Sequence, residues 1–147
     1  ILDLENSNCD DYLFGPLAKR VLLVGDSAAG SISDAIVSVA KSNEFNFSVY
    51  YANSCPVTAR AYKYRENCEN NFAQISDYIE KLNPDLLVIA NMSDLYVSES
   101  GLGKVIVDFD GNPARSADEA LQLWITGLRS RIENSFSMRK VLIVQQP

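Results

Sequence analysis

Short apolar runs that alternate with segments of helical periodicity constrain this sequence more than any other feature. Four such runs are present, Val21–Val24, Phe47–Ala52, Leu86–Ala90 and Val141–Val144, of which the second is interrupted by Ser48. Continuous apolar runs of this length are typical of strands that are buried on both faces of a parallel sheet. Because strands that alternate with helices are joined by right-handed crossovers, the pattern predicts an α/β fold. We expect a three-layer α/β/α sandwich with a central parallel sheet in flavodoxin-like order.

The segments between the runs carry helix signals. Apolar residues recur at helical spacing over Ser31–Ser42 and again over residues 72–82. The second helix is expected to end at Asn83, because the residue before a proline is steered out of the helical conformation. Ser116 and Glu119 form a capping-box pattern at the start of a third helix, whose apolar stripe includes Leu121, Ile125, Leu128 and Ile132. Between them, "KVIVDFDGN" predicts a small strand that ends in a turn at Asp110-Gly111.

Length and composition indicate one domain over residues 1–147. The chain has 147 residues, of which 47% are hydrophobic and 22% charged, as in an ordinary compact domain. Its net charge is -6 and no run is rich in Lys or Arg, so a nucleic-acid partner is not expected. No apolar run approaches the roughly 20 residues that span a bilayer. Residues 1–19 are expected to be a lead-in, and the absence of an initiator Met indicates a piece of a longer protein.

The three cysteines are Cys9, Cys55 and Cys68. Cys55 and Cys68 lie in polar surroundings at the two ends of a loop-like segment, which favours a disulfide over reduced core thiols. A bridge closing a loop of about 14 residues contributes roughly 3 kcal/mol. The pairing implies an oxidising compartment. It leaves Cys9 over, and we expect Cys9 to pair with a cysteine outside these residues.

The first apolar run continues directly into Gly25-Asp26-Ser27. A serine on a sharp strand-to-helix turn lies at the carboxyl edge of a parallel sheet, where ligand sites of such folds are found. The helix N-terminus there offers N–H groups to a developing oxyanion. Ser27 is therefore a candidate nucleophile. The alternative is that Gly25 permits a tight turn and that Asp26 or Ser27 only caps the helix.

Nucleotide and metal sites find little support. Gly25 and Gly30 have the G-x-x-x-x-G spacing of a P-loop, but Ser31 stands where the phosphate-binding lysine is required. The G-x-G-x-x-G dinucleotide motif fails because position 27 is serine. No metal-ligand spacing occurs. We therefore expect no cofactor, and a flavodoxin-like nucleotide binder is kept only as a lesser hypothesis.

Three features together resemble one known family. They are the strand that leads into "GDS", the "NSCPV" segment with a second cysteine about a dozen residues later, and the polar corner "NMSD" after the third strand. This combination resembles the SGNH hydrolase-like domain that is fused to membrane-bound acyltransferases of type three. The resemblance implies an extracytoplasmic domain of a protein whose membrane acyltransferase part O-acylates cell-surface or secreted glycans. It also implies an acyl-enzyme on Ser27, and the candidate catalytic residues are Ser27 and Asp26.

The resemblance further implies an oxyanion hole built from three corners of the sheet edge. The family uses the N–H of the serine itself, a glycine after the second strand and an asparagine in G-x-N-D after the third. This chain has no glycine after the second strand, and Asn53 or Ser54 occupies that corner. After the third strand, Asn91 takes the place of the glycine and Ser93 that of the asparagine. The candidate donors are thus Ser54, Asn91 and Ser93, and an ordinary role in capping these loops is the alternative.

The sequence contains no histidine, although the family takes its base from an Asp-x-x-His motif near the end of the domain. Two accounts follow. In one, this fragment lacks the last helix and strand of the domain and the base lies there, with a glycan or acylated carbohydrate as substrate. In the other, the domain is a degenerate glycan-binding or interaction module. Ala28, where these domains often have histidine, favours the second account.

Overall fold

A computed structural model describes residues 7–58, 67–98, 106–108, 110–136 and 140–145. The elements, in chain order, are β1 (Ser7–Tyr12), β2 (Arg20–Gly25), α1 (Ser27–Ser42), β3 (Asn46–Ala52), α2 (Asn67–Leu82), β4 (Leu86–Asn91), α3 (Ser93–Val97), α4 (Ala117–Ser135) and β5 (Lys140–Gln145). The strands form one sheet in the order β1-β3-β2-β4-β5. Its parallel part, β3-β2-β4-β5, has the flavodoxin-like order that the alternating pattern predicts. The α/β fold is confirmed.

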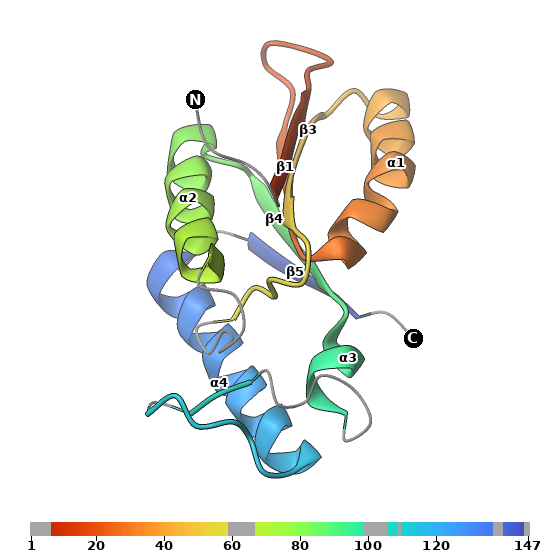
Figure 1. The fold of residues 1–147 in the computed structure, drawn as a ribbon. Helices are drawn as coiled ribbons and strands as arrows, with labels where there is room; N and C mark the ends of the chain where they lie inside the picture. Colours follow the sequence, from red (N-terminus) through yellow and green to blue (C-terminus); the bar gives the residue numbers. More distant parts are fainter. Residues whose placement is uncertain (1–6, 59–66, 99–105, 109, 137–139, 146–147) are drawn as a thin grey trace.

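The helices form layers on both faces of the sheet (Figure 1). α1 covers one face, and α2 and α4 lie on the other. On the α1 face, Leu23, Val49 and Val88 pack with Ala29 and Ala40 of the helix. Successive side chains of a strand point to opposite faces, so β2, β3 and β4, whose two faces are both covered, have apolar residues on both. The three-layer sandwich follows from that pattern.

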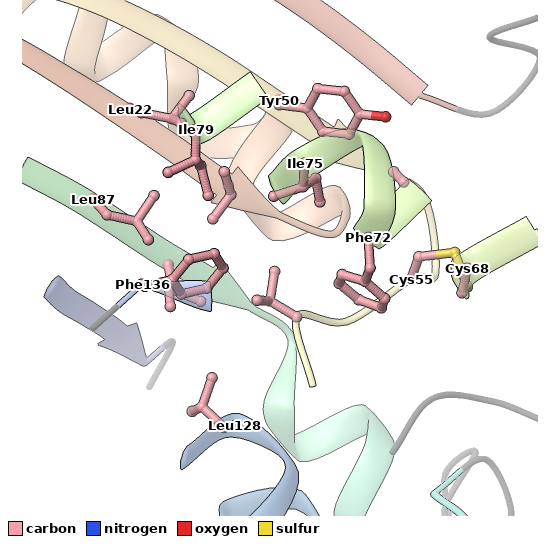
Figure 2. Packing of buried hydrophobic residues seen from close by; sticks show 14 residues of the cluster. Leu22, Tyr50, Cys55, Cys68, Phe72, Ile75, Ile79, Leu87, Leu128 and Phe136 are labelled. Atoms are coloured by element: carbon pink, nitrogen blue, oxygen red, sulfur yellow. A yellow bond between two sulfur atoms is a disulfide. The ribbon is translucent and has the colours of Figure 1, made fainter. Parts of the chain in front are cut away.

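The core on the α2 and α4 face is the larger of the two (Figure 2). Leu22 and Leu87 of the sheet pack there with Ile75 and Ile79 of α2. Phe136, which directly follows α4, closes the same cluster with only 2% of its surface exposed. A third, smaller cluster holds α3 against α4, where the ring of Tyr96 stacks on that of Trp124 at a centroid distance of 5.5 Å.

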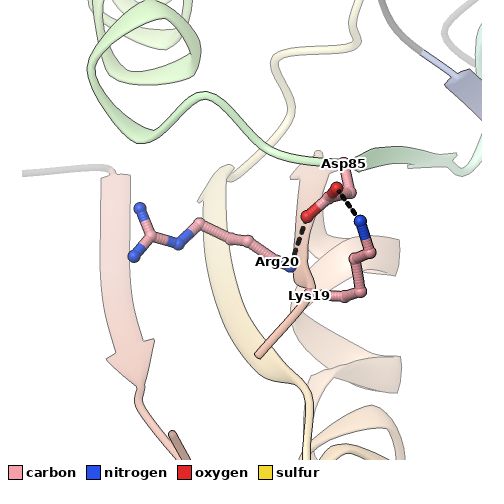
Figure 3. A network of polar contacts seen from close by, with 3 residues as sticks. All are labelled: Lys19, Arg20 and Asp85. Carbon is pink, nitrogen blue, oxygen red and sulfur yellow. Dashed lines mark hydrogen bonds and ion pairs between the residues drawn. The ribbon is translucent and has the colours of Figure 1, made fainter. Parts of the chain in front are cut away.

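The starts of the central strands are fixed by Asp85, at the amino edge of the sheet (Figure 3). Its carboxylate accepts from the Arg20 N–H at 2.9 Å and from the Lys19 ammonium at 2.9 Å. The Arg20 N–H and the Lys19 side chain lower the pKa of Asp85. The ion pair is exposed, so its main effect is to align the ends of β2 and β4 rather than to stabilise the fold.

The expectation that residues 1–19 form only a lead-in was wrong, because they contain β1. This strand pairs with β3 in antiparallel register, with Asp11 opposite Ser48, so the sheet is mixed rather than purely parallel. The Asp11 carboxylate accepts from the Ser48 hydroxyl and, at 2.7 Å, from the Tyr78 hydroxyl of α2. β1 has the sequence SNCDDY, whose polar residues suit a solvated edge strand and give no apolar signal.

Several element boundaries also differ from the predicted ones. α1 begins at Ser27 instead of Ser31, because Asp26 caps it. The loop expected after the third strand contains α3, a helix of five residues. The small strand predicted near residue 107 is reduced to one bridge between Val107 and Pro113, and the turn at Gly111 is present with a φ of 80°. Part of that predicted strand lies outside the described residues.

The predicted cap of α4 is present in a modified form. The Ser116 hydroxyl accepts from the Glu119 N–H at 3.2 Å, as a capping box requires. The Glu119 carboxylate reaches one residue further back than expected and accepts from the Arg115 N–H at 2.6 Å. The predicted apolar stripe is only partly buried, since Leu121 and Ile125 are 40% and 41% exposed.

Candidate functional site

The candidate site residues follow neighbouring strands at one edge of the sheet. Gly25 at the end of β2 lies between Tyr51 of β3 and Ala90 of β4 in the strand register. The segments that begin at Asp26, after Ala52 and after Asn91 therefore leave the sheet side by side. Adjacent strands are about 4.8 Å apart, so this edge brings together the three corners that the sequence singles out.

Gly25 makes the turn possible by close approach rather than by an unusual backbone angle. A Cβ atom built on Gly25 would lie 1.8 Å from the carbonyl oxygen of Ala90 and 2.9 Å from the Cβ of Ala29. No side chain fits between these groups. The first turn of α1 can thus start directly against the end of β4.

Asp26 is the N-cap of α1 and is fully buried, with 0% of its surface exposed. One carboxylate oxygen accepts from the Ala28 N–H at 2.8 Å, and the other accepts from the Met92 N–H at 3.0 Å. The first bond caps the helix, and the second joins the helix to the segment that follows β4. The sequence left open whether Asp26 or Ser27 caps α1, and the structure assigns that role to Asp26.

Ser27 is the first residue of α1 and is exposed. Within the described part of the chain, its hydroxyl has no hydrogen-bond partner. The first N–H groups of a helix have no acceptor inside the helix, and the positive end of the helix dipole lies here. Because Asp26 has taken the capping role, the Ser27 hydroxyl is left facing solvent beside groups that favour negative charge.

Asn91, the last residue of β4, is 5% exposed. Its carboxamide oxygen accepts from the Val57 N–H at 3.0 Å, which ties the segment after β3 to the end of β4. Only the oxygen of an amide can accept from an N–H, so this bond fixes the orientation of the group. The NH2 half of Asn91 is then the part that can donate to a ligand.

Ser54 lies in the segment between β3 and α2 and has a φ of 58°. This is the left-handed region that favours glycine, and it occurs at the corner where the family resemblance leads one to expect glycine. The next residue, Cys55, forms a disulfide with Cys68 of α2, as predicted. Cys9 is free and exposed, and partial burial of its thiol raises its pKa.

A groove that the sequence did not predict begins at this same corner. Asn91, Ser93 and Asp94 line it where β4 ends, and the rest of its lining is mostly apolar side chains of α4 and β5, with the charged Arg129 and Glu133 among them. Its volume is about 450 Å³, within the range of ligand sites in proteins. The sequence signal is the apolar stripe that includes Ile125, and its periodicity does not say what covers the stripe.

The structure thus brings together Ser27, Asp26, Asn91 and Ser93, and it links them to the segment with Ser54. Trp124 is 5% exposed in its stack with Tyr96, and Asp108 accepts from the N–H of Asn112 in an exposed turn. In the described ranges, no three His, Cys, Asp or Glu side chains gather as metal ligands. Nor does any helix in those ranges have the length and apolarity to cross a membrane.

Comparison with known proteins gives one match. A family model described as "SGNH domain (fused to AT3 domains)" matches residues 3–147. No curated protein and no solved structure matches the chain significantly. The family match covers the whole candidate site.

Proposed function

Because this chain belongs to the SGNH domain family that is fused to AT3 domains, we propose that it transfers or hydrolyses O-acyl esters on cell-surface or secreted glycans. Acetyl is the simplest such acyl group. The observation that carries the proposal is the state of Ser27. Ser27 is exposed at a helix N-terminus, and its hydroxyl does not cap the helix because the buried Asp26 does so.

In the proposed reaction, the Ser27 Oγ attacks the carbonyl carbon of the ester while a base accepts its proton. The carbonyl oxygen becomes an oxyanion, which the N–H groups of Ser27 and Ser54 and the side chain of Asn91 or Ser93 stabilise. The C–O bond to the sugar then breaks, and the sugar oxygen leaves with the proton. Water or another hydroxyl group attacks the acyl-enzyme in the second step and releases Ser27.

Asp26 acts in this scheme as a positioning residue rather than as the base. Both of its oxygens accept backbone N–H groups, and these bonds hold Ser27 against the segment that follows β4. A serine hydroxyl needs a base at neutral pH, and the sequence has no histidine. We therefore assign the base to an imidazole outside these 147 residues.

The disulfide and the family membership support a proposal for the compartment in which the domain acts. Disulfides persist in oxidising compartments, and Cys55 is joined to Cys68. Together with the fusion that characterises the family, this supports an extracytoplasmic domain tethered to a membrane acyltransferase domain of the same polypeptide. The expected partners are that domain and an acylated carbohydrate.

The test is ester hydrolysis by the full-length polypeptide that carries these residues. With p-nitrophenyl acetate and an acetylated glycan, Ser27→Ala is expected to lower kcat/KM by about 1,000-fold or more. Ser31→Ala is the matched control, because Ser31 lies in the same helix and its hydroxyl donates to the Ala28 carbonyl oxygen. Equal rates for the Ser27→Ala protein and the wild type would remove Ser27 from the mechanism.

A second candidate function is a glycan-binding or interaction module without catalysis. The absence of histidine and the presence of Ala28 after the serine favour it. In that case, glycan binding would survive Ser27→Ala, and the full-length wild type would turn over no ester. Measuring glycan binding by the Ser27→Ala protein and ester hydrolysis by the wild type therefore separates the two candidates.

A further inference from the structure

Gly30 of α1 lies directly against the ring of Tyr51. A Cβ atom built on Gly30 would be 2.8 Å from the Cε2 and Cζ atoms of that ring, closer than carbon atoms pack. Gly30 is inside a helix, where glycine is less favourable than alanine. The missing side chain allows the Tyr51 ring to pack on the backbone of the helix, and the helix backbone in turn fixes the ring.

The Tyr51 ring lies one helical turn from Ser27. Tyr51 pairs with Gly25 in the strand register, at the carboxyl edge of the sheet. Ser27 and Gly30 are three residues apart in α1, and positions with that spacing share one face of a helix, about 5–6 Å apart. A glycan whose ester group lies at Ser27 can therefore place a sugar ring against Tyr51.

Tyr51 has an unused polar group. The residue is only partly buried, and in the described part of the chain its hydroxyl has no hydrogen-bond partner. The hydroxyl is also not one of the fully buried polar atoms, so water reaches it. Tyrosine presents an apolar ring and a polar tip, a combination that suits a ligand with both C–H and hydroxyl groups.

Two exposed carboxylates lie beside this ring. Asp34 follows Gly30 by four residues and so shares its face of α1, and Asp10 is on β1, the neighbour of β3 in the sheet. Burial raises the pKa of Tyr12, and the charges of Asp10, Asp34 and Tyr51 raise it further, which indicates that the three lie close together. We call Tyr51, Asp10 and Asp34 the Tyr51 surface.

The Tyr51 surface is on a different face and at a different edge of the sheet from the α4 groove. Tyr51 packs with the core of the α1 face, whereas α4 lies on the other face (Figure 1). β5 is at the opposite edge from β1, with β4 and β2 between β5 and β3. A segment that covers the α4 groove would therefore leave the Tyr51 surface uncovered.

We propose that a sugar residue of a neutral glycan stacks on the Tyr51 ring, next to the ester at Ser27. The C–H groups of a sugar face pack against an aromatic face, and the carboxylates of Asp10 and Asp34 accept hydrogen bonds from its hydroxyl groups. Because the two carboxylates repel anions, the surface disfavours acidic sugars. This inference rests on the proposed function, since Ser27 locates the ester.

The test uses the full-length polypeptide with acetylated xylan and acetylated mannan, two neutral glycans, and with p-nitrophenyl acetate, which has no sugar. Tyr51→Ala should lower the ratio of kcat/KM for the glycans to kcat/KM for p-nitrophenyl acetate by about 10-fold, because the stacking contact is lost. Tyr51→Phe keeps the ring and should retain most of the ratio. Acetylated alginate, which is anionic, should be a poorer substrate than either neutral glycan.

Gly30→Ala is the second variant, and it remains informative if the Tyr51→Ala protein does not fold. Alanine suits the helix, but its Cβ atom must displace the Tyr51 ring, so the ratio should fall here too. Ser38→Ala, at an exposed position of the same helix, is its control and should not change the ratio. Asp34→Asn should lower the ratio, whereas Asp77→Asn, at an exposed position of α2, should not.

Wild-type ratios in both the Tyr51→Ala and the Gly30→Ala proteins would overturn the proposal, as would a preference for acetylated alginate. Ser27→Ala separates this failure from failure of the proposed function. If Ser27→Ala abolishes hydrolysis of every ester while the Tyr51 variants keep the ratio, Ser27 is the nucleophile and the Tyr51 surface has no role. If Ser27→Ala changes no rate but Tyr51→Ala weakens glycan binding in calorimetry, the proposed reaction fails and the Tyr51 surface still binds the glycan.

Discussion

The helices α1 and α4 both begin after a capping side chain, but the two caps differ in what else they hold. At α4 the cap is Ser116, which is exposed and bonds only within its own helix turn, to the Glu119 N–H. At α1 the cap is Asp26, which is buried and also accepts from the Met92 N–H, 66 residues further along the chain. The cap at Ser116 only begins a helix, whereas the cap at Asp26 also joins two distant segments.

The difference explains why the hydroxyl of Ser116 is used in capping and that of Ser27 is not. A serine that caps a helix uses its hydroxyl oxygen as an acceptor, as Ser116 does. In α1 the aspartate one position earlier does this work, so Ser27 occupies the first helical position with its hydroxyl available. The GDS turn thus separates the structural role from the candidate catalytic role. Four substitutions test this comparison, from the largest expected effect to the smallest.

Gly25→Ala should have the largest effect on stability. The new Cβ atom would overlap the Ala90 carbonyl oxygen at 1.8 Å, so β2 and β4 must move apart at the site of the turn. We expect a loss of about 4 kcal/mol in the free energy of unfolding, measured by urea denaturation. Gly15→Ala is the control, because its Cβ would meet only the Ala18 Cβ at 3.6 Å. Similar stabilities for the two variants would contradict the close approach at Gly25.

Asp26→Ala should follow, at about 3 kcal/mol. It removes a helix cap, which contributes about 1 kcal/mol, and leaves the partly buried Met92 N–H without its acceptor, which costs about 1–3 kcal/mol. Hydrogen exchange should also become faster at the Met92 amide, because that amide loses its partner. Unchanged exchange there would mean that Asp26 does not link α1 to the segment after β4.

Ser116→Ala should cost only about 1 kcal/mol, because the bond to the Glu119 N–H lies within one exposed turn. The same urea experiment measures it, and amide exchange should change only in the first turn of α4. The contrast with Asp26→Ala isolates the tertiary part of the α1 cap. Equal losses for the two alanine variants would remove that contrast.

Ser27→Ala should change the free energy of unfolding by no more than about 0.5 kcal/mol, since an exposed side chain without a partner in the described structure is removed. Activity should fall steeply in the same variant. A stability loss near that of Ser116→Ala would indicate that the Ser27 hydroxyl has a structural bond, and it would weaken the case for a nucleophile.

Much of the fold could be predicted because it depends on local patterns. The run Val21–Val24 is apolar at every position, and so short a run that leads into a glycine is typical of a strand with both faces buried. β1 escaped prediction because its side chains are polar and its partners, Ser48 and Tyr78, are distant in sequence. The apolar stripe of α4 was predicted, but not its partial exposure, because periodicity gives the direction of a face and not what covers it.

The sequence predicted which residues lie at the carboxyl edge of the sheet, but it did not predict the hydrogen bonds between them. "GDS", "NSCPV" and "NMSD" each follow a strand, and parallel strands end at one edge, so Ser27, Ser54, Asn91 and Ser93 were expected there. The Asn91 bond to the Val57 N–H and the groove along α4 depend on how the loops and helices pack. No local pattern encodes such contacts.

The sequence by itself determined the alternating α/β architecture, the disulfide between Cys55 and Cys68 and the serine at the end of the first parallel strand. These features depend on residue type and spacing along the chain, which fix backbone preference and hydrophobic periodicity. The tertiary structure alone decided that Asp26 and not Ser27 caps α1, and that an apolar groove continues from the same corner. The groove is lined by residues dozens of positions apart, and Asp26 is also bonded to the Met92 N–H, 66 residues further along the chain, so both depend on the assembled sheet.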